Sequence, residues 1–329
     1  METILDHPQA VVRITGGGGR LTVTVEPKVG VVVAIRHCET GYPLDLIEHV
    51  LRVKGPSFLC DEILRDEDPI YVQNALHWDI LSFAPREHFV GRRLLDFGAG
   101  SGASSMVLAR MFLQTEIVGA DLVPEFLELA RHRAVFYGVS DRVSFSCSLA
   151  ADRLPPDIGS FDHIVFSAVY EHLLPAERQI MLPLLWAHLK PGGILFLDQT
   201  PYRWFPVESH TTGLPLLNYL PDGLALACAR RFSRRIKPDI SWPQLLRKGV
   251  RGGTVGEILW ILNRDGRTAE LLAPSQLGVC DHIDLWYRRS SSVRRPLAKK
   301  VAHAGFRAAK ALTGATILPT LSLALRKAV

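Results

Sequence analysis

The N-terminal part of the chain shows hydrophobic patterns that predict a small sheet followed by helices. Leu21–Val25 alternates apolar and polar residues, which is the pattern of a strand with one buried face. The apolar runs Val11–Ile14 and Val29–Ile35 predict two further strands beside it. Apolar residues at helical spacing predict helices over residues 43–53 and 69–83. We therefore expect a β meander or sheet extension and two helices in this region.

From Arg93 onwards, short apolar runs alternate with segments of helical periodicity. Such alternation predicts parallel strands joined by crossover helices on both faces, which is a doubly wound α/β sheet. The predicted strands are Leu94–Phe97, Glu116–Ala120, Arg142–Cys147, His163–Ser167 and Ile194–Asp198, and the predicted helices cover residues 103–113, 124–137 and 176–189.

Regular patterning weakens after Asp198. Residues 200–223 are rich in proline, glycine and aromatic residues, Val279–Tyr287 predicts one late strand, and helical spacing returns from about residue 296. We expect four parts, which are an N-terminal β and helical extension over 1–88, an α/β core over 89–200, a cap with a late strand over 201–287 and a basic helical tail over 288–329.

Charge is distributed unevenly along the chain. The sequence has 38 Lys and Arg residues and 33 Asp and Glu residues, but residues 288–329 hold ten of the bases and none of the acids. The segment from Arg294 to Lys310 has the spacing of a basic amphipathic helix. Anionic membrane surfaces attract such segments by about 1 kcal/mol per base. Ile317, Leu318, Leu321, Leu323 and Leu325 could then enter the interface. The alternative is a helix that packs on the body of the protein or on a partner.

Composition excludes several classes of protein. With 47% hydrophobic and 22% charged residues, the chain is globular and neither collagenous nor disordered. Its five cysteines are scattered and form no CxxC pair, which argues against a disulfide framework or a zinc site. No signal peptide or membrane-spanning run is recognisable. We expect a cytoplasmic protein, peripheral at the inner membrane face if the tail binds lipid, and no nucleic-acid partner, since Phe306 is the tail's one aromatic residue.

A glycine-rich segment, Asp96–Gly102, lies between a predicted strand and a predicted helix. Ligands of open α/β sheets bind at the carboxyl ends of the strands. Gly98, Gly100 and Ala103 also fit a weak dinucleotide fingerprint, and Asp121 is placed to hold a ribose diol in either case. Asp96, however, would repel a pyrophosphate and attract a cation. It therefore favours S-adenosylmethionine, which carries an ammonium and a sulfonium.

Four segments resemble the motifs of class I S-adenosylmethionine-dependent methyltransferases, in the family's order. These segments are Leu95–Gly102, Gly119–Leu122, Phe161–Val165 and Leu189–Gly193. The resemblance covers about residues 90–200 and implies a Rossmann-like sheet, methyl transfer and S-adenosylmethionine as cofactor. The cofactor-binding residues that it implies are Asp96, Gly98, Ala99, Gly100, Gly102, Asp121, Leu122, Ala150, Ala151, Asp152 and Ser167.

The resemblance also implies a role for individual residues. Asp96 and the glycine loop would hold the methionine end of the cofactor, Asp121 the ribose hydroxyls and Leu122 the adenine. One departure concerns the segment after the third strand, where Ala150 stands at the position of a usual acid. Either Asp152 or a backbone carbonyl would then contact the adenine amine.

Three residues are candidates for a general base, which accelerates methyl transfer to a hydroxyl by about 10²–10⁴-fold. His172 directly follows the fourth strand, His210 lies in the loop after the fifth, and Asp198 ends the fifth strand. Each histidine also has a structural alternative, as a residue that shapes the pocket or as an ordinary loop residue. No triplet in the sequence suggests a metal site.

Absent motifs narrow the acceptor. Ser167–Tyr170 replaces the Asn/Asp-Pro-Pro-Tyr motif of enzymes that methylate amino groups in nucleic acids, and neither a Pro-Cys nucleophile nor a paired-glutamate loop is present. We predict O-methylation of a small-molecule, sugar or lipid-linked glycan acceptor, with the aromatic residues of 201–219 as a binding wall or as core. The alternatives are N- or C-methylation of a natural-product or quinone-like acceptor, a non-catalytic S-adenosylmethionine-binding protein, and a dinucleotide oxidoreductase.

Overall fold

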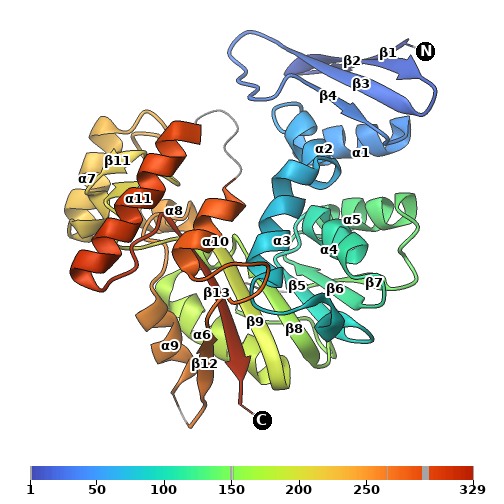
Figure 1. The fold of residues 1–329 in the computed structure, drawn as a ribbon. Helices are drawn as coiled ribbons and strands as arrows, with labels where there is room; N and C mark the ends of the chain where they lie inside the picture. Colours follow the sequence, from blue (N-terminus) through green and yellow to red (C-terminus); the bar gives the residue numbers. More distant parts are fainter. Residues whose placement is uncertain (1, 149, 151, 265, 291–295, 329) are drawn as a thin grey trace.

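Seven strands of the described residues form one mixed sheet at the centre of the computed structural model (Figure 1). The structure describes residues 2–148, 150, 152–264, 266–290 and 296–328. The strand order is β12-β13-β9-β8-β5-β6-β7, parallel from β9 to β7 and antiparallel at β13 and β12. The parallel strands are β5 (Arg93–Phe97), β6 (Glu116–Asp121), β7 (Val143–Cys147), β8 (Phe161–Ser167) and β9 (Leu189–Pro201).

Helices cover both faces of these strands because neighbouring strand residues point to opposite faces. On β5, Leu94 packs in the hydrophobic cluster that includes α3, α4 and α5, whereas Leu95 packs in the cluster of α6 and α9. The predicted doubly wound α/β fold is therefore confirmed. The covering helices are α3 (Asn74–Leu81), α4 (Ala103–Met111), α5 (Pro124–Phe136), α6 (Pro175–His188) and α9 (Val255–Leu262).

The C-terminal residues complete the sheet. Strand β13 (Thr320–Lys327) lies between β9 and β12 (Ala269–Leu272), with Ser322 opposite Asp198. Three alternate leucines of β13 are buried against the α6 and α9 side of the sheet. For these three leucines, the alternative of entering a membrane interface is therefore wrong, because the sheet and its helices cover their side chains. The leucines are Leu321, Leu323 and Leu325.

The predicted late strand Val279–Tyr287 is also wrong, since helix α10 (His282–Arg289) occupies most of it. The side chain of Asp281 accepts hydrogen bonds from the backbone N–H groups of Ile283 and Asp284. An Asp in this N-cap position stabilises a helix start by about 1 kcal/mol. This local signal outweighs the apolar run that suggested a strand.

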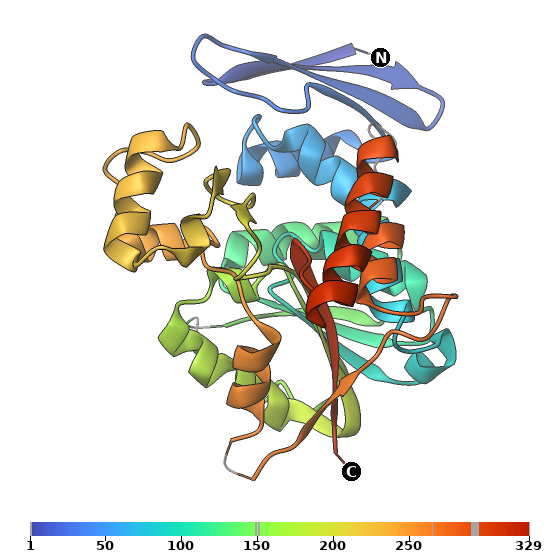
Figure 2. The same ribbon diagram turned by 60° about the vertical axis from the view of Figure 1, so that its left-hand side comes forward.

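Helix α11 (Pro296–Thr313) packs beside α10 (Figure 2). Arg307 Nη1 and Lys310 Nζ lie 2.8 and 2.9 Å from Asp281 Oδ2, and Phe306 meets Trp286 edge to face. These contacts support the alternative in which the basic helix packs on the body. Within the described residues, none of the helices combines the length and the apolar character needed to cross a membrane. The tail residues Arg294 and Arg295 lie outside the described residues.

The N-terminal meander pairs in the order β1-β2-β3-β4, and one of its predicted strands is wrong. The run Val29–Ile35 is not a strand, because the chain turns at Gly30 and the side chains of Val29 and Val32 are exposed. The pattern also missed β1, an edge strand that alternates exposed and half-buried residues. The strands are β1 (Glu2–His7), β2 (Ala10–Gly17), β3 (Arg20–Pro27) and β4 (His37–Thr40).

Helices α1 (Leu44–Lys54) and α2 (Leu59–Glu67) lie between the meander and the core (Figure 1). The pattern predicted α1 but missed α2, whose sequence is mostly charged. The helix predicted over residues 69–83 begins as a π turn, Pro69–Gln73, and continues as α3.

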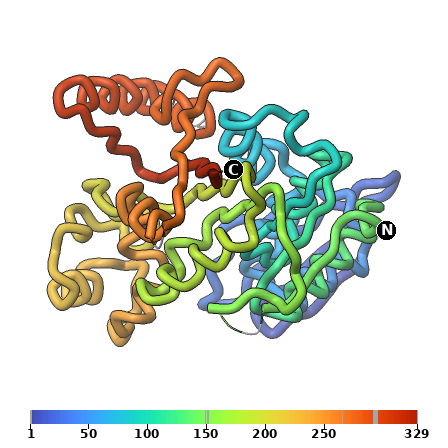
Figure 3. Tube along the Cα trace, turned by 90° about the horizontal axis from the view of Figure 1, so that it is seen from below, coloured from blue at the N-terminus to red at the C-terminus, as the bar shows by residue number. Residues whose placement is uncertain are grey.

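Short elements fill the segment between β9 and α9, on the side away from the meander (Figure 3). They surround a hydrophobic cluster of their own, which includes Leu217, Ala225 and Leu245. The elements are β10 (Val207–Glu208), β11 (Leu214–Pro215), α7 (Asp222–Phe232) and α8 (Trp242–Arg247).

The side chain of Arg133, on α5, joins the N-terminal helices to the core. It is fully buried, and its guanidinium donates to the carbonyl oxygens of Ser101 and Glu62 at 2.9 and 2.8 Å. Ser101 Oγ in turn donates to Glu62 Oε2 at 2.5 Å. Buried charges are tolerated only with such partners. The end of the glycine loop is thereby held against α2.

Replacing the buried guanidinium should destabilise the whole protein. We expect Arg133→Met to lower the free energy of unfolding by about 3–5 kcal/mol, because Glu62 and Asp66 lose a buried cationic partner and only Lys54 remains beside Glu62. Urea denaturation measures this, with the exposed Arg52→Met on α1 as a matched control that changes little. Equal losses in the two variants would contradict the assigned role of Arg133.

Candidate functional site

A pocket of about 240 Å³ opens at the carboxyl ends of β5, β6, β7 and β8. This is the edge at which ligands bind in open α/β sheets. The pocket is lined by Phe97, Gly98, Ala120, Asp121, Leu122, Ser148, Ala150, Ala168, Val169, His172 and Leu173.

The start of the glycine loop, at Phe97 and Gly98, forms one wall of the pocket. Gly98 and Gly102 have φ angles of 81° and 86°, in the left-handed region that favours glycine. A Cβ at Gly98 would lie 2.3 Å from a methyl carbon of Val169, and one at Gly102 would lie 2.6 Å from the Cβ of Ala130. Glycine is therefore required at both positions, which bring the loop close to β8 and to α5.

Asp121 presents an oriented carboxylate to the pocket. Its Oδ2 accepts a hydrogen bond from the N–H of Gly100 at 2.9 Å, and its Oδ1 accepts one from Val123 at 3.1 Å. A carboxylate has about four acceptor sites, so both oxygens keep capacity for a ligand. The arrangement suits a pair of adjacent hydroxyl groups.

Asp96 lies beneath the loop and does not line the pocket. Its side chain is buried, and Oδ2 accepts hydrogen bonds from Ser104 Oγ and Ser105 Oγ at 2.7 and 2.6 Å. Burial raises the pKa of Asp96 to about 6, although the two serine hydroxyls oppose the shift. Asp96 therefore anchors the start of α4 and supplies a negative charge behind the glycine loop.

The other predicted cofactor residues are distributed around the pocket. Leu122 and Ala150 line it together with Gly98 and Asp121, whereas Asp152 lies in a turn outside it. Ser167 donates to Asp198 Oδ1 at 2.5 Å and also lies outside the lining. Three loop residues, Ala99, Gly100 and Gly102, shape the loop without lining the pocket. Ala151 lies outside the described residues.

The sequence analysis missed several lining residues: Phe97, Ala120, Ser148, Val169 and Leu173. Each stands within a few positions of the end of a parallel strand. The strand ends alone would have identified them, because these ends converge on one edge of the sheet.

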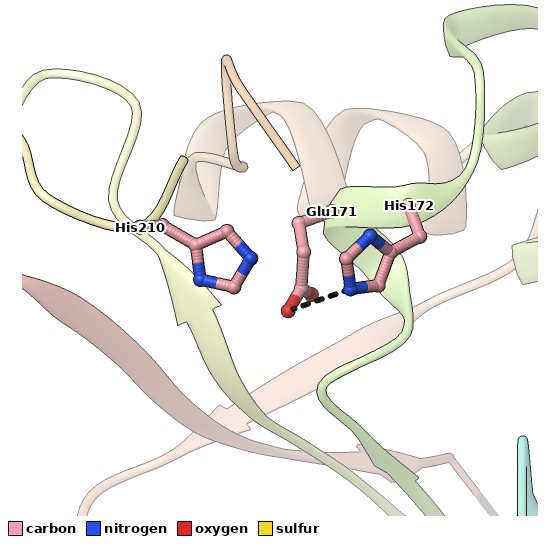
Figure 4. Close-up of side chains that lie close together, drawn as sticks. All are labelled: Glu171, His172 and His210. Atoms are coloured by element: carbon pink, nitrogen blue, oxygen red, sulfur yellow. Dashed lines mark ion pairs between the residues drawn. The ribbon is translucent and has the colours of Figure 1, made fainter. Parts of the chain in front are cut away.

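Glu171, His172 and His210 lie close together (Figure 4), and His172 also lines the pocket. Glu171 and His172 belong to the turn after β8, and His210 follows β10. His172 Nδ1 lies 2.8 Å from the carbonyl oxygen of Arg247 and donates to it, since a carbonyl is only an acceptor. The other ring nitrogen, Nε2, lies 3.8 Å from Glu171 Oε1. His172 therefore keeps a free lone pair near the pocket.

The three candidate bases differ in their access to the pocket. His172 lines it with a side chain that is 43% exposed, and the His210 ring lies 5.7 Å from the His172 ring. Asp198 is 1% exposed and is not among the lining residues. Burial also raises the pKa of Glu171, beside His172, to about 7.

Comparison with known proteins identifies the part of the chain around this pocket. A family model described as a methyltransferase domain matches residues 94–193. The ubiquinone biosynthesis O-methyltransferase of Xanthomonas euvesicatoria is 30% identical over 132 residues, which cover 40% of this chain and 52% of that protein. The demethylmenaquinone methyltransferase of Deinococcus radiodurans is 36% identical over 110 residues, which cover 33% and 44%. The chain thus spans about half the length of these relatives.

Solved structures show a more distant similarity. An S-adenosylmethionine-dependent methyltransferase from Clostridium acetobutylicum is 18% identical with a TM-score of 0.37, over 46% of this chain and 58% of that one. The glycopeptide N-methyltransferase MtfA is 23% identical with a TM-score of 0.31, over 34% and 48%. The matched family model and the four sequence motifs fall on the same residues. Residues 94–193 therefore form a methyltransferase domain.

Proposed function

We propose that the protein transfers a methyl group from S-adenosylmethionine to a hydroxyl oxygen of a small-molecule acceptor. The observation that carries this proposal is that Asp121 and His172 line the same pocket. A nucleoside held by the Asp121 carboxylate would place its reactive end close to the imidazole. Holding both reactants in one site is the main contribution that an enzyme makes to a displacement reaction.

The residues present fit the cofactor. The oriented Asp121 carboxylate suits the two ribose hydroxyls, Leu122 offers an apolar surface that is 47% exposed, and Asp96 supplies negative charge behind the loop. When bound, S-adenosylmethionine supplies the electrophilic methyl group. The chain itself has to orient the acceptor and to assist the loss of the hydroxyl proton.

We assign the activation of the acceptor hydroxyl to His172. Its Nδ1–H is fixed by the carbonyl oxygen of Arg247, so Nε2, on the Glu171 side of a ring that lines the pocket, keeps its lone pair. Asp198 is a weaker candidate because it is buried and bonded to Ser167. His210 does not line the pocket, and its ring lies 5.7 Å from the His172 ring.

The proposed acceptor is a small molecule that carries a hydroxyl group. The missing motifs favour a sugar, lipid-linked glycan or other small-molecule hydroxyl, and the names of the two relatives favour a quinone-like ring as second candidate. The exposed rings of Trp204 and Tyr219 stack 5.9 Å apart. They offer an aromatic surface instead of a core contact.

Removing the Asp121 carboxylate should weaken cofactor binding. Each hydrogen bond from a ribose hydroxyl to this charged acceptor is worth about 1.5–3 kcal/mol. We expect Asp121→Ala to raise the dissociation constant of S-adenosylhomocysteine at least tenfold in isothermal titration calorimetry, whereas the exposed Asp141→Ala leaves it unchanged. An unchanged dissociation constant for Asp121→Ala would contradict the proposed contact between Asp121 and the ribose.

Cofactor affinity should also depend on pH through Asp96. With its pKa near 6, this carboxyl is ionised at pH 7 and mostly protonated at pH 5, so the attraction for a bound ammonium is lost as the pH falls. We expect about tenfold weaker binding at pH 5 than at pH 7, which follows from a pKa of 6. Titration calorimetry at both values tests this. The same pH dependence in Asp96→Asn would assign the effect to another group.

Loss of the His172 imidazole should slow the reaction without loosening the cofactor. We expect His172→Ala to lower kcat by about 10²–10⁴-fold, the usual contribution of a proton-transferring side chain. A screen of phenolic, sugar and lipid-linked acceptors with a labelled methyl donor supplies the assay. Full activity in His172→Ala would show that the acceptor hydroxyl needs no help from this residue.

A further inference from the structure

One carboxylate and two imidazole groups converge at the rim of the pocket (Figure 4). One potential ligand atom from each of Glu171, His172 and His210 lies within 4.8 Å of the other two. The three side chains come from two segments that are far apart in the sequence, the turn after β8 and the loop after β10. The methyltransferase motifs account for none of this grouping.

One carboxylate oxygen of Glu171 accepts no hydrogen bond from any described residue. Its side chain is fully buried, and Oε2 accepts a hydrogen bond from Thr200 Oγ1 at 3.1 Å. Oε1 has no hydrogen-bond partner among the described residues and points toward His172 Nε2. The nearby Arg178 pairs with Glu257 at 3.3 Å instead. An unpaired buried carboxylate oxygen is costly, and a bound cation would compensate it.

His172 is held as metal-binding histidines are held. Such residues donate the second ring N–H to a backbone carbonyl or a carboxylate, which fixes the tautomer and the ring orientation. The bond from His172 Nδ1 to the carbonyl oxygen of Arg247 has this form and leaves the lone pair of Nε2 directed to the Glu171 side.

The backbone around His210 leaves space for the cluster. Gly249 has a φ of 91°, and a Cβ there would lie 2.7 Å from the His210 ring and 3.1 Å from Glu171 Cγ. The loop that carries His210 is fixed by Glu208, which accepts hydrogen bonds from the N–H groups of Thr211 and Thr212 at 2.8 and 2.6 Å. The position of His210 is thus built into the fold.

We propose that Glu171, His172 and His210 bind a divalent transition-metal ion such as Zn²⁺. Two histidines and one glutamate are the ligand set of catalytic zinc sites that keep an open coordination position. Tetrahedral ligand atoms with bonds of about 2.0–2.2 Å lie about 3.3–3.6 Å apart. The three ligand atoms, which lie within 4.8 Å of one another, reach that geometry after side-chain movements of about 1 Å.

The chemical role of the ion rests on the proposed function, whereas its binding does not. Because His172 also lines the pocket, an ion held by it would be reached by an acceptor bound there. A metal ion lowers the pKa of an oxygen acid bound to it. The acceptor hydroxyl then releases its proton to water, its oxygen forms the new bond to the methyl carbon, and the carbon–sulfur bond breaks to leave S-adenosylhomocysteine. The lone pair of His172 Nε2 cannot bind the ion and accept a proton at the same time. With the ion bound, the ion therefore activates the acceptor hydroxyl in place of His172.

The test uses Co²⁺, whose visible absorption reports its coordination, added to the full chain after treatment with a chelator. We expect one equivalent to bind, Zn²⁺ to displace it and Mg²⁺ to compete poorly, because Mg²⁺ prefers oxygen ligands. Removing a residue that only hydrogen-bonds to a metal ligand lowers metal affinity by about 10–100-fold. Because Glu171 and His210 are proposed to be ligands themselves, Glu171→Gln and His210→Ala should each weaken Co²⁺ binding by at least about 100-fold. The exposed His37→Ala in the meander is the matched control and should bind as the unmodified protein does.

Equal Co²⁺ affinity in the unmodified protein, Glu171→Gln and His210→Ala would overturn the proposal. If Glu171→Gln fails to fold, the exposed His210→Ala decides alone, since its ring is not part of a core. S-adenosylhomocysteine binding is measured on the same samples. Cofactor binding without Co²⁺ binding refutes the metal site only, whereas Co²⁺ binding without cofactor binding refutes the proposed function.

Discussion

The glycine loop keeps its shape because one buried guanidinium, that of Arg133, ties it to the N-terminal helices. Ser101 accepts a hydrogen bond from Arg133, and the neighbouring Gly100 donates to the carboxylate of Asp121. A chain of short contacts thus runs from Glu62 on α2 to the carboxylate that faces the pocket. The N-terminal extension therefore supports the site. Because the Arg133 guanidinium is buried, water cannot replace a hydrogen-bond partner that it loses.

The opposite side of the pocket depends on segments that follow the parallel strands. Arg247, at the end of α8, orients His172, and Gly249 leaves the space that the His210 ring occupies. The C-terminal strand β13 pairs along β9 and so fixes the strand from which this segment departs. Both sides of the pocket are consequently held by contacts between residues that are distant in the sequence.

The matched methyltransferase domain contains the residues that line the pocket, whereas residues that support both sides lie outside it. Asp121 and His172 lie within residues 94–193, which this chain shares with its relatives. His210, Arg247 and Gly249 lie beyond them. The lining of the pocket thus falls within the matched domain, whereas the residues that orient His172 and surround His210 come from outside the match.

The sequence by itself determined the five parallel strands, the glycine loop and the position of Asp121, because these depend on periodicity and turn residues that act over a few positions. Tertiary structure alone decided that Asp96 lies buried behind serine hydroxyls, that the apolar C-terminal segment enters the sheet, and that His210 joins Glu171 and His172. Each of these outcomes is a contact between segments far apart in the chain. A local pattern records that a segment is apolar or carries a ligand group, but the partner that it meets is selected only when the whole core packs.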